Sequence, residues 1–487
     1  MSDKLTFIVN GERIDLTDFS PTQTPLSFLR NQRVLTGSKE GCAEGDCGAC
    51  TVIVGELESG SIQYRAINAC ITFLPMLHNK VVITVEGIAG PQGELHPVQQ
   101  AIIDHHGSQC GFCTPGFVTS LTAAHLSGEQ HDRAGINDIL AGNLCRCTGY
   151  GPLISAGEQA LAQASPDWHI ARQKKSEKLL RDIENDQACV FQCEGQRWDM
   201  PVALSELAQL YKQYPEAILV AGASDIGLWV TKQLRQLPHL IDVTRIKELC
   251  EIEEQDLSIR IGAGVRYHDA MDNIAVLYPD FGELVRRIGG RQVRNTGTIG
   301  ANIANGSPIG DTPPALIALG AQLVLRCGSK TRSMPLEDYF LSYGSQDRAK
   351  SEFVEAIEIP KLGNPDQLKC YKLSKRFDQD ISSLCGCFNI EVAQDRVITA
   401  RIAYGGMAGI PKRARAVEQA LIGKSWNRAV IKEAMLAYSD DFSPLGDMRG
   451  SSDYRLLAAR NLLLKVFDES RAPLGDTRLV GRGSAVT

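Results

Sequence analysis

Eight of the fifteen cysteines lie in two closely spaced groups within the first third of this 487-residue chain. One group has the spacing Cys-x4-Cys-x2-Cys plus a later member, and the other pairs Cys-x2-Cys with Cys-x-Cys: Cys42, Cys47, Cys50 and Cys70, then Cys110, Cys113, Cys145 and Cys147. Thiolates bind iron–sulfur cores, and the first spacing is that of plant-type ferredoxins, in which one loop supplies three ligands. The sequence therefore predicts two 2Fe–2S clusters and one-electron transfer.

Disulfides and structural zinc are the alternative interpretations of these cysteines. The N-terminal segment lacks the basic, apolar and small-residue order of a secretory signal, so a cytoplasmic location is expected and disulfides are disfavoured. No apolar run reaches the roughly 20 residues that span a bilayer. Zinc favours paired Cys-x2-Cys arms, which the first group lacks. On spacing alone, zinc stays open for the second group.

The segments around the first group have the pattern of short strands. Strands are expected at residues 5–9, 12–16, 51–54 and 81–85. The first two are joined at Asn10-Gly11, which is a strong hairpin signal. Glycines and alanines in the loop 41–50 tolerate the backbone conformations needed to wrap a cluster. We therefore expect a ferredoxin-like β-grasp domain over residues 1–90.

After about residue 95 the periodicity of apolar residues changes from that of a strand towards that of a helix. Helices are expected to begin near His96-Pro97, Thr114-Pro115 and Gly151-Pro152, with Thr114 as an N-cap, because a proline fits the first turn. Both cysteine pairs of the second group then lie at helix ends. This pattern predicts a four-helix-type 2Fe–2S domain over residues 91–165.

Residues 166–195 are weakly patterned and contain a charged run. This predicts a linker with a solvated surface, and a partner-binding role is the alternative. The net charge of −6 favours solubility. The chain has no basic face and no alternation of basic and aromatic residues, so neither nucleic acid nor a membrane is expected as a partner.

From about residue 200, strand and helix patterns alternate, with small-residue turns after strands. Leu219–Leu228 reads as a strand, a small-residue loop and a helix, and Arg294–Asp311 as a longer loop rich in glycine, hydroxyl and amide groups. Such loops offer N–H groups to a pyrophosphate, so two of them predict a dinucleotide site. The first loop alone is equally consistent with an ordinary turn and lacks the G-x-G-x-x-G fingerprint. We expect a nucleotide-binding domain at 196–370, an α+β subdomain at 371–475 and a flexible tail at 476–487.

Three cysteine-containing runs are more specific than their spacing, namely Cys42–Cys50, Gln109–Gly116 and Asn143–Tyr150. They resemble the iron–sulfur segments of the xanthine oxidase family of molybdenum hydroxylases. The resemblance implies an α+β multidomain chain with two 2Fe–2S clusters, an FAD domain of vanillyl-alcohol-oxidase-like fold and an α+β C-terminal flavoprotein subdomain. It also implies that the cluster in the helical domain lies nearer a molybdenum cofactor, with Gln109 beside the pterin.

The resemblance further implies which residues contact FAD. Carried over by position, they form two loops and four single sites: Leu219, Val220, Ala221, Gly222, Ala223, Ser224, Asp225 and Ile226; Thr298, Ile299, Gly300, Ala301 and Asn302; and Ile288, Asp311, Val354 and Lys372. Asp311 is expected at a ribose or adenine-side group, and Val354 and Lys372 beside the flavin. Ala223 departs from a common asparagine. Ile288 stands where relatives carry an aromatic residue, which weakens stacking on the flavin.

The electron acceptor and the partner follow from the resemblance alone. Tyr343 and Asp380 correspond to positions on the NAD side of the flavin, and a charged surface loop is the alternative. No further region is long enough for a molybdenum–pterin domain, so a separate large molybdopterin-binding subunit is implied, as in two-subunit bacterial members. A heterotetramer of two small and two large subunits is expected.

In this scheme purine is hydroxylated on the large subunit, and no residue of this chain touches it. Electrons pass singly through the clusters to FAD, which stores two and delivers a hydride to NAD. The alternative is an electron-transfer module for an aldehyde or N-heterocycle hydroxylase with another acceptor.

Seven cysteines lie outside the two groups: Cys189, Cys193, Cys250, Cys327, Cys370, Cys385 and Cys387. Their irregular spacing favours thiols that act as small apolar residues over a third metal site. Cys385-x-Cys387 is a candidate redox pair.

Overall fold

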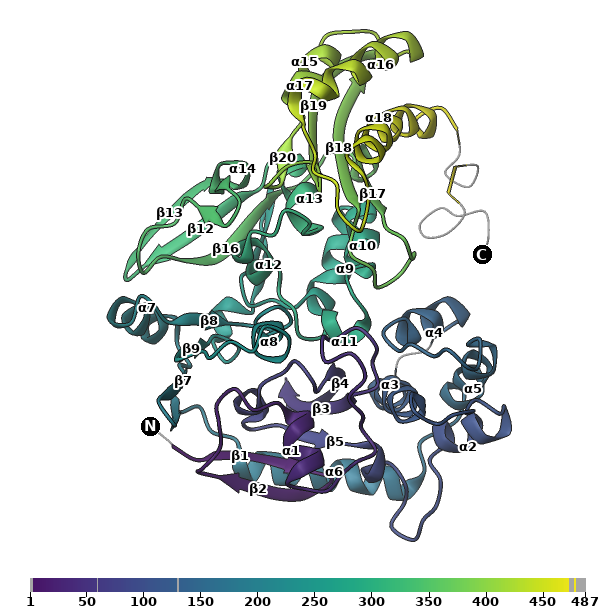
Figure 1. Ribbon diagram of the computed structural model, residues 1–487, viewed down its shortest axis with the longest axis vertical. Helices are drawn as coiled ribbons and strands as arrows, with labels where there is room; N and C mark the ends of the chain where they lie inside the picture. Colours follow the sequence, from purple (N-terminus) through teal and green to yellow (C-terminus); the bar gives the residue numbers. More distant parts are fainter. Residues whose placement is uncertain (1–2, 59, 129–130, 473–476, 479–487) are drawn as a thin grey trace. The chain divides into compact units, whose positions relative to one another are not determined.

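The computed structural model describes residues 3–58, 60–128, 131–472 and 477–478 (Figure 1). The chain divides into two compact units. The first comprises Met1–Leu207, Glu216–Lys247 and Gly289–Gly297, and the second comprises Ala208–Pro215, Glu248–Ile288 and Thr298–Thr487.

The first unit begins with a five-stranded sheet in the order β2-β1-β5-β3-β4. Its strands are β1 (Leu5–Val9), β2 (Glu12–Leu16), β3 (Thr51–Glu58), β4 (Ser61–Asn68) and β5 (Val81–Ile83). The predicted hairpin is confirmed, because β1 and β2 pair antiparallel and Asn10 and Gly11 adopt φ values of 50° and 85°. Helix α1 (Pro25–Asn31) packs Phe28 on Phe7 of β1, with ring centroids 5.6 Å apart.

A helical bundle follows, as the sequence predicts. Its helices are α2 (Pro97–Asp104), α3 (Thr114–Ser127), α4 (Arg133–Leu140) and α5 (Gly151–Leu161). Helix α3 contacts β3 and β4 as well as its neighbouring helices. Its N-cap is Cys113 rather than the expected Thr114, which is the first helical residue. Helix α4 was not predicted, because only Ile136, Ile139 and Leu140 form its buried face.

The segment predicted as a linker contains a long helix, α6 (Asp167–Ile183), which contacts β1 and β3. The buried residues of α6 are His169, Ser176, Leu180 and Ile183. Only two of these four are apolar, so the helical period is weak in the sequence and the charged residues dominate it.

The first unit also holds a four-stranded sheet in the order β6-β7-β9-β8. Its strands and associated helices are β6 (Cys189–Cys193), β7 (Gln196–Met200), β8 (Ile218–Val220), β9 (His239–Asp242), α8 (Ile226–Thr231) and the separate turn α11 (Arg291–Arg294). Helix α7 (Leu204–Gln213) has its first four residues in the first unit and the rest in the second. Trp198 of β7 is fully buried edge-on to Phe73, with centroids 5.6 Å apart, so this sheet shares a core with the first one.

The second unit is built on an antiparallel sheet in the order β10-β11-β16-β12-β13. Its elements are β10 (Ile252–Glu254), β11 (Ser258–Gly262), β12 (Gln322–Cys327), β13 (Lys330–Pro335), β16 (Phe353–Pro360), α9 (Tyr267–Leu277), α10 (Pro279–Arg286), α12 (Ile299–Asn305), α13 (Thr312–Leu319), α14 (Leu336–Tyr339), β14 (Phe340–Ser342) and β15 (Ser345–Gln346). The sheet and the helices α9, α10, α12 and α13 enclose one hydrophobic core.

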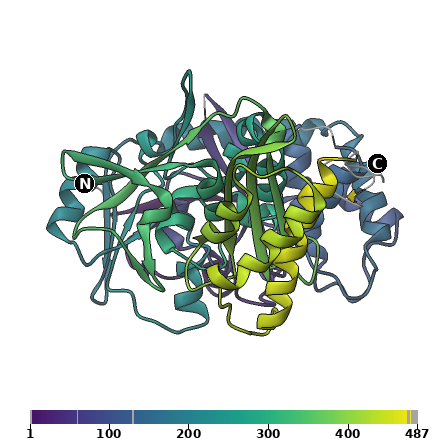
Figure 2. The same ribbon diagram turned by 90° about the horizontal axis from the view of Figure 1, so that it is seen from above.

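A four-stranded sheet and four helices complete the second unit. They are β17 (Leu368–Leu373), β18 (Leu384–Ala393), β19 (Arg396–Gly405), β20 (Lys412–Arg413), α15 (Arg415–Leu421), α16 (Arg428–Ala434), α17 (Tyr438–Asp441) and α18 (Ser452–Glu469). Helix α18 lies against β18, as Figure 2 shows from above. The predicted tail, 476–487, lies outside the described residues except for 477–478.

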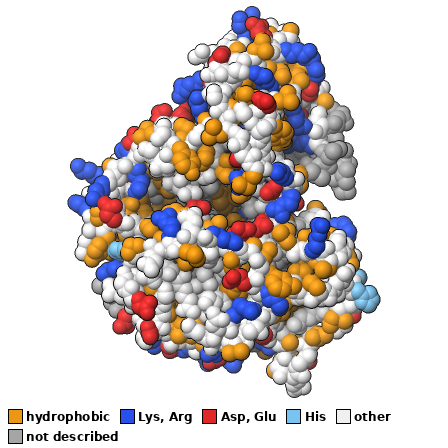
Figure 3. All heavy atoms as spheres, in the orientation of Figure 1, with side chains coloured by type: hydrophobic (Ala, Val, Ile, Leu, Met, Phe, Trp, Pro, Cys, Tyr) orange, Lys and Arg blue, Asp and Glu red, His pale blue; other side chains and the backbone are white. Residues whose placement is uncertain are grey.

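Short 3-10 turns occupy Leu74–Leu77, Val85–Gly87, Lys247–Leu249, Pro365–Gln367 and Met435–Ala437. Acidic and basic side chains are interspersed on the face shown in Figure 3. No helix in the described part of the chain combines the length and apolar character of a membrane span.

Candidate redox centres

The thiols of the first cysteine group converge beside β3 and β4. Cys42 contacts the thiols of Cys47 and Cys70, and Cys70 also contacts Cys50. These hydrogen bonds between thiols lower the pKa of Cys42 and raise the pKa values of Cys47 and Cys70. A 2Fe–2S core is held by four cysteine thiolates, so the chemistry of this donor set fits such a core.

Backbone donors and glycines shape the loop around these thiols. The amide groups of Glu44, Asp46 and Cys47 donate to Cys42 Sγ at 3.4, 3.4 and 3.3 Å. Gly48 has a φ of 69°, and a Cβ there would lie 2.2 Å from the carbonyl oxygen of Gly142. The loop therefore requires glycine at this position, and its N–H groups supply hydrogen bonds of the kind that set a cluster's potential.

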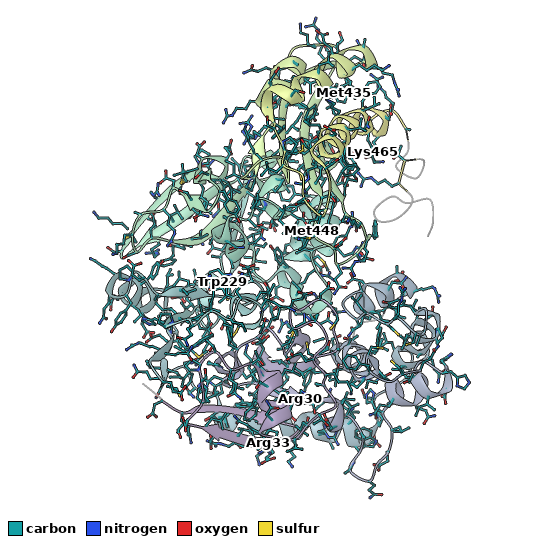
Figure 4. The ribbon with its side chains drawn as sticks, in the orientation of Figure 1. Arg30, Arg33, Trp229, Met435, Met448 and Lys465 are labelled. Carbon is teal, nitrogen blue, oxygen red and sulfur yellow. The ribbon has the colours of Figure 1, made fainter. Side chains whose placement is uncertain are left out.

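Arg30 anchors the segment that leads into this loop. It lies at the end of α1 (Figure 4), and its Nη1 donates to the carbonyl oxygens of Thr36 and Ser38 at 2.9 and 2.7 Å. The amide of Lys39 donates to the carbonyl oxygen of Ala49 at 2.9 Å, so the two ends of the loop are tied together. Cys42 is thus held on a short, closed loop.

The second cysteine group lies at the ends of α3 and α5 and is more open to solvent. Cys110 contacts Cys147, and Cys113 contacts Cys145. Burial, followed by the contact with Cys145, raises the pKa of Cys113 to about 12. Cys110 and Cys147 are exposed, whereas Cys113 and Cys145 are partly buried. This donor set also fits a 2Fe–2S core, with one edge turned outward.

Two neighbours orient Cys145. Its Sγ accepts hydrogen bonds from the amide and hydroxyl of Thr148, at 3.5 and 3.1 Å, and its own amide donates to Tyr150 Oη at 3.0 Å. No three His, Cys, Asp or Glu side chains in the described ranges surround a single metal ion. That finding does not bear on a two-iron core, whose four thiolates enclose a larger centre.

The loops that carry the two cysteine groups are hydrogen-bonded to each other. The amide of Leu144 donates to the carbonyl oxygen of Cys47 at 2.9 Å, and Asn143 Nδ2 donates to that of Gly48 at 3.1 Å. Cys145 follows Leu144 directly, so one backbone hydrogen bond connects a residue of the first group to the neighbour of a residue of the second. Sequence reasoning missed the role of Asn143, because nothing in the cysteine spacing marks it.

The first nucleotide loop, Leu219–Ile226, lies between β8 and α8 in the first unit. Ala223 has a φ of 56°, and its carbonyl oxygen accepts a hydrogen bond from the amide of Gly227 at 2.7 Å. A Cβ on Gly222 would lie 2.0 Å from the carbonyl oxygen of Thr296. The first loop therefore packs against Thr296, near the start of the second predicted loop, Arg294–Asp311. Trp229, labelled in Figure 4, lies in α8, the helix that follows the loop.

The part of the second nucleotide loop that the resemblance assigns to FAD, Thr298–Asn302, lies in the second unit. Thr298 caps α12 by accepting from the amide of Ala301 at 3.2 Å. A Cβ on Gly300 would lie 2.4 Å from Cα of Ala263, so only glycine lets α12 approach that backbone. Asn302 accepts a hydrogen bond from the hydroxyl of Thr312 at the start of α13.

Asp311 and Lys372 form a buried ion pair in the second unit. Lys372 Nζ lies 2.6 Å from Asp311 Oδ2 and donates to the carbonyl oxygen of Arg287 at 3.0 Å. The hydroxyl of Ser382 donates to Asp311 Oδ1 at 2.6 Å. The two residues that the resemblance assigns to different parts of FAD are therefore bonded to each other. Val354 is buried in the core, and Ile288 packs against it.

The two NAD-side candidates lie on loops of the second unit. Tyr343, in the turn between β14 and β15, is 78% exposed. Asp380 accepts hydrogen bonds from the amides of Arg376 and Ile381 at 2.9 and 3.1 Å, so it stabilises its own loop. Phe377 of that loop lies under the guanidinium of Arg287, 4.0 Å from the ring centroid. Tyr343 and Asp380 thus lie on two different loops of this unit.

Three of the remaining cysteines lie together in the core of the second unit. Cys370 of β17 stands opposite Cys387 of β18, and Cys385 is two residues away on the same strand. Cys385 and Cys387 are fully buried, and burial raises the pKa of Cys387. All three contribute to or pack against the hydrophobic core.

Three segments of the chain match known domain families. Residues 84–158 match the [2Fe-2S] binding domain, residues 191–362 the FAD binding domain in molybdopterin dehydrogenase, and residues 369–470 the CO dehydrogenase flavoprotein C-terminal domain. The fold is therefore a multidomain α+β arrangement with iron–sulfur, FAD-binding and flavoprotein C-terminal domains.

The chain is similar to several curated proteins. Xanthine dehydrogenase 2 of Arabidopsis thaliana is 30% identical over 94% of this chain and 39% of its own length. Xanthine dehydrogenase of Drosophila pseudoobscura pseudoobscura is 32% identical over 84% and 34%, and aldehyde oxidase 2 of Macaca fascicularis is 29% identical over 92% and 38%. This chain thus spans between a third and two-fifths of the length of these relatives.

Two solved structures have a similar fold. Carbon monoxide dehydrogenase from Hydrogenophaga pseudoflava is 29% identical with a TM-score of 0.52, and the match covers 55% of this chain and 93% of that one. Quinoline 2-oxidoreductase from Pseudomonas putida 86 gives a TM-score of 0.52 over 55% and 94%, and its 22% identity indicates the fold alone.

Proposed function

We propose that this chain belongs to the xanthine oxidase family of molybdenum hydroxylases and is the iron–sulfur and FAD subunit of a two-subunit xanthine dehydrogenase. As an electron-transfer module of that family, it receives electrons from a molybdenum centre on a partner. In the proposed reaction the partner hydroxylates hypoxanthine or xanthine. The electrons then pass through two 2Fe–2S clusters to FAD and on to NAD.

The observation that carries the electron-transfer role is the meeting of the two cysteine groups in one compact unit. The amide of Leu144 bonds to the carbonyl of Cys47, so the two donor sets are held at a fixed spacing. The proposed ligands are Cys42, Cys47, Cys50 and Cys70 for one cluster and Cys110, Cys113, Cys145 and Cys147 for the other. When bound, the clusters supply one-electron redox chemistry. The residues of this chain hold the ligands and donate hydrogen bonds to their sulfurs.

The exposed edge of the second group supports a docked partner. Gln109, Cys110 and Cys147 are all exposed, and Phe112 between them is 46% exposed. A large aromatic side chain beside exposed ligands is unusual for a free surface, since aromatic residues are enriched in protein interfaces. We propose that the large molybdopterin-binding subunit covers this edge, in a heterotetramer of two small and two large subunits.

The FAD residues are proposed from the two loops and four single sites named from the sequence. The small side chains in Leu219–Ile226 and Thr298–Asn302 would let backbone N–H groups approach a diphosphate closely. Asp311 and Lys372 form a buried ion pair within the second unit, and we propose that this pair lies beside the bound FAD. When bound, FAD accepts single electrons and releases them in pairs.

NAD is the proposed acceptor because the relatives at 30% identity or above are named xanthine dehydrogenases. Tyr343 and Asp380 are the proposed residues on its side of the flavin. Aldehyde oxidase 2 is also a relative, at 29% identity, so a module that serves an aldehyde or N-heterocycle hydroxylase is the second candidate.

The proposal is tested with the purified chain after reconstitution with iron, sulfide and FAD. NADH should reduce the bound flavin and drive reduction of an artificial dye. If NADH leaves the flavin oxidised while dithionite reduces it, NAD is not the acceptor and the second candidate is favoured. Affinity purification from the source cell should also recover a large subunit that contains molybdopterin, and a partner without molybdopterin would remove the hydroxylase assignment.

A further inference from the structure

A short segment from the sequence of the FAD domain packs inside the iron–sulfur unit. Gly289–Gly297, which carries α11, belongs to the first compact unit. Arg294 is 1% exposed and pairs with Asp138 of α4 at 2.7 Å. Asn295 Nδ2 donates to the carbonyl oxygen of Ala66 in β4 at 2.8 Å. The segment is therefore fixed against both the helical bundle and the ferredoxin-like sheet.

Gln292 of α11 reaches the point where the two ligand-bearing loops meet. Its Nε2 lies 3.0 Å from Asn143 Oδ1, 3.1 Å from Ser120 Oγ and 3.3 Å from Thr51 Oγ1. The side chain is 1% exposed, and its Oε1 has no hydrogen-bond partner among the described groups. Burying Oε1 without a partner costs free energy, so the stabilising contribution of this side chain comes from the hydrogen bonds that Nε2 donates.

Asn143 connects Gln292 to the first cysteine group by hydrogen bonds. Its Oδ1 accepts from both Gln292 and Ser120, while its Nδ2 donates to the carbonyl oxygen of Gly48 at 3.1 Å. The next residue, Leu144, donates its amide to Cys47. Gln292 therefore fixes the side chain of Asn143, which directly precedes Leu144 and its backbone hydrogen bond to Cys47.

Gln292 is closely packed against two glycines. A Cβ on Gly142 would lie 1.8 Å from Gln292 Oε1, and a Cβ on Gly290 would lie 2.4 Å from Cα of Gly142. Close-packed interiors transmit small displacements, so we expect a substitution of Gln292 to displace the Asn143–Leu144 peptide.

We propose that Gln292 is a positioning residue for electron transfer between the two clusters, because it holds the Asn143–Leu144 peptide against Cys47. This inference rests on the proposed electron-transfer function. Each transfer removes one electron from one centre and adds it to the other, with no proton moved and no bond made or broken. Its rate then depends on how closely the two loops are held together.

Three variants of the full chain, reconstituted with both clusters and FAD, test the proposal. Gln292→Met keeps the length of the side chain and removes its N–H donors. Gln292→Glu keeps the shape but places a carboxylate oxygen against Asn143 Oδ1. Gln100→Met is the matched control, since Gln100 is an exposed residue of α2 in the same unit. Iron and acid-labile sulfide contents are measured first, so that assembly is separated from positioning.

The first readout is amide hydrogen exchange at Leu144. Loss of hydrogen bonding from Gln292 should speed this exchange about fivefold in Gln292→Met, because a net hydrogen bond is worth about 1 kcal/mol and local opening follows that loss. The second readout is the time for one electron, placed on the chain by a light-triggered donor, to equilibrate between the clusters, followed by freeze-quench EPR. Equilibration should slow in both Gln292 variants and stay unchanged in Gln100→Met.

Unchanged exchange at Leu144 together with unchanged equilibration would overturn the proposal. If Gln292→Met does not bind both clusters, the two measurements are made on Gln292→Glu instead. If neither variant binds the helical-domain cluster, Gln292 is a structural residue and the proposal is likewise overturned. The electron comes from light, so failure of NADH to reduce the flavin would remove the NAD assignment and leave this test intact.

Discussion

At the scale of single residues, the first nucleotide loop contains a backbone conformation that alanine disfavours. Ala223 has a φ of 56°, a left-handed value that costs an L-residue roughly 1–2 kcal/mol. Asparagine tolerates this region, which gives a physical reason for the asparagine that the family often has there. The sequence marked the departure at Ala223, but only the backbone explains it.

Ala223→Gly should therefore stabilise the apoprotein. Glycine removes the left-handed cost but adds backbone freedom to the unfolded chain, so we expect a net gain of about 0.5–1 kcal/mol. The measurement is the urea midpoint of the apoprotein, followed by a signal from Trp229 near this loop. A lower midpoint would mean that the Ala223 methyl group makes contacts worth more than the strain.

Gly222→Ala should have the opposite effect. Its Cβ would lie 2.0 Å from the carbonyl oxygen of Thr296, so the loop must shift, at a cost of about 1–3 kcal/mol. We expect flavin content after reconstitution to fall while both cluster spectra remain. Gly363→Ala is the control, because a Cβ there meets nothing within 4 Å. Full flavin content in Gly222→Ala would show that this loop does not contribute to FAD binding.

The sequence predicted functional residues where their spacing along the chain is typical of a known kind of site, and it did not predict the others. The eight cysteines stand at intervals that only a few kinds of site produce, and the structure gathers them into two groups. Asn143 and Gln292 act through partners as far as 241 residues away in the chain, so no local pattern reveals them.

At the scale of elements, short or polar helices were the ones missed. Helix α4 has three buried apolar residues, and α6 has two, so neither produces a clear helical period. The hairpin at Asn10-Gly11 was predicted because its turn residues have a conformational preference of their own. Elements whose helicity depends on tertiary packing are beyond what a single sequence encodes locally.

Helix α6 is attached to the bundle through a group of buried histidines. His96 caps α2 and lies beside His125 and His169, with ring centroids 4.9 and 4.6 Å away. Burial, followed by the positive charges of neighbours, lowers the pKa of His96 to about 3 and that of His169 to about 4. Arg172 of α6 also donates to the carbonyl oxygen of Ala89 at 2.8 Å.

The attachment of α6 should weaken as the pH falls below 6.5. Between pH 6.5 and about 3 the unfolded chain binds a proton at His96 that the folded chain does not, so stability is lost as the pH is lowered through this window. Each such histidine contributes at most about 1.4 kcal/mol per pH unit. His96→Asn, which keeps an N-cap acceptor, should flatten the pH dependence of amide exchange in α6. Exposed His106→Asn is the control, and an unchanged profile in His96→Asn would show that His96 does not govern the attachment.

At the scale of the whole molecule, three domain families match successive segments of the chain, and contacts between residues show where one segment leaves its own domain. The order of iron–sulfur, FAD-binding and C-terminal segments was anticipated from motifs that resemble family members. The insertion of Gly289–Gly297 into the first unit was not, because a contiguous stretch of sequence gives no sign that it leaves its own domain. The chain is thus divided in space differently from its division along the sequence.

Because the two cysteine groups lie on separate elements, one cluster should be removable without the other. Cys147→Ser should lower iron from about four to about two atoms per chain and abolish one EPR signal, since each 2Fe–2S core needs four thiolates. Cys147 is exposed, so the substitution leaves the buried packing of the bundle in place. Cys42→Ser should abolish the other signal, and Cys250→Ser, at an exposed cysteine outside both groups, should change neither. Loss of both signals in Cys147→Ser would instead show that the junction at Leu144 and Cys47 makes assembly of each cluster depend on the other.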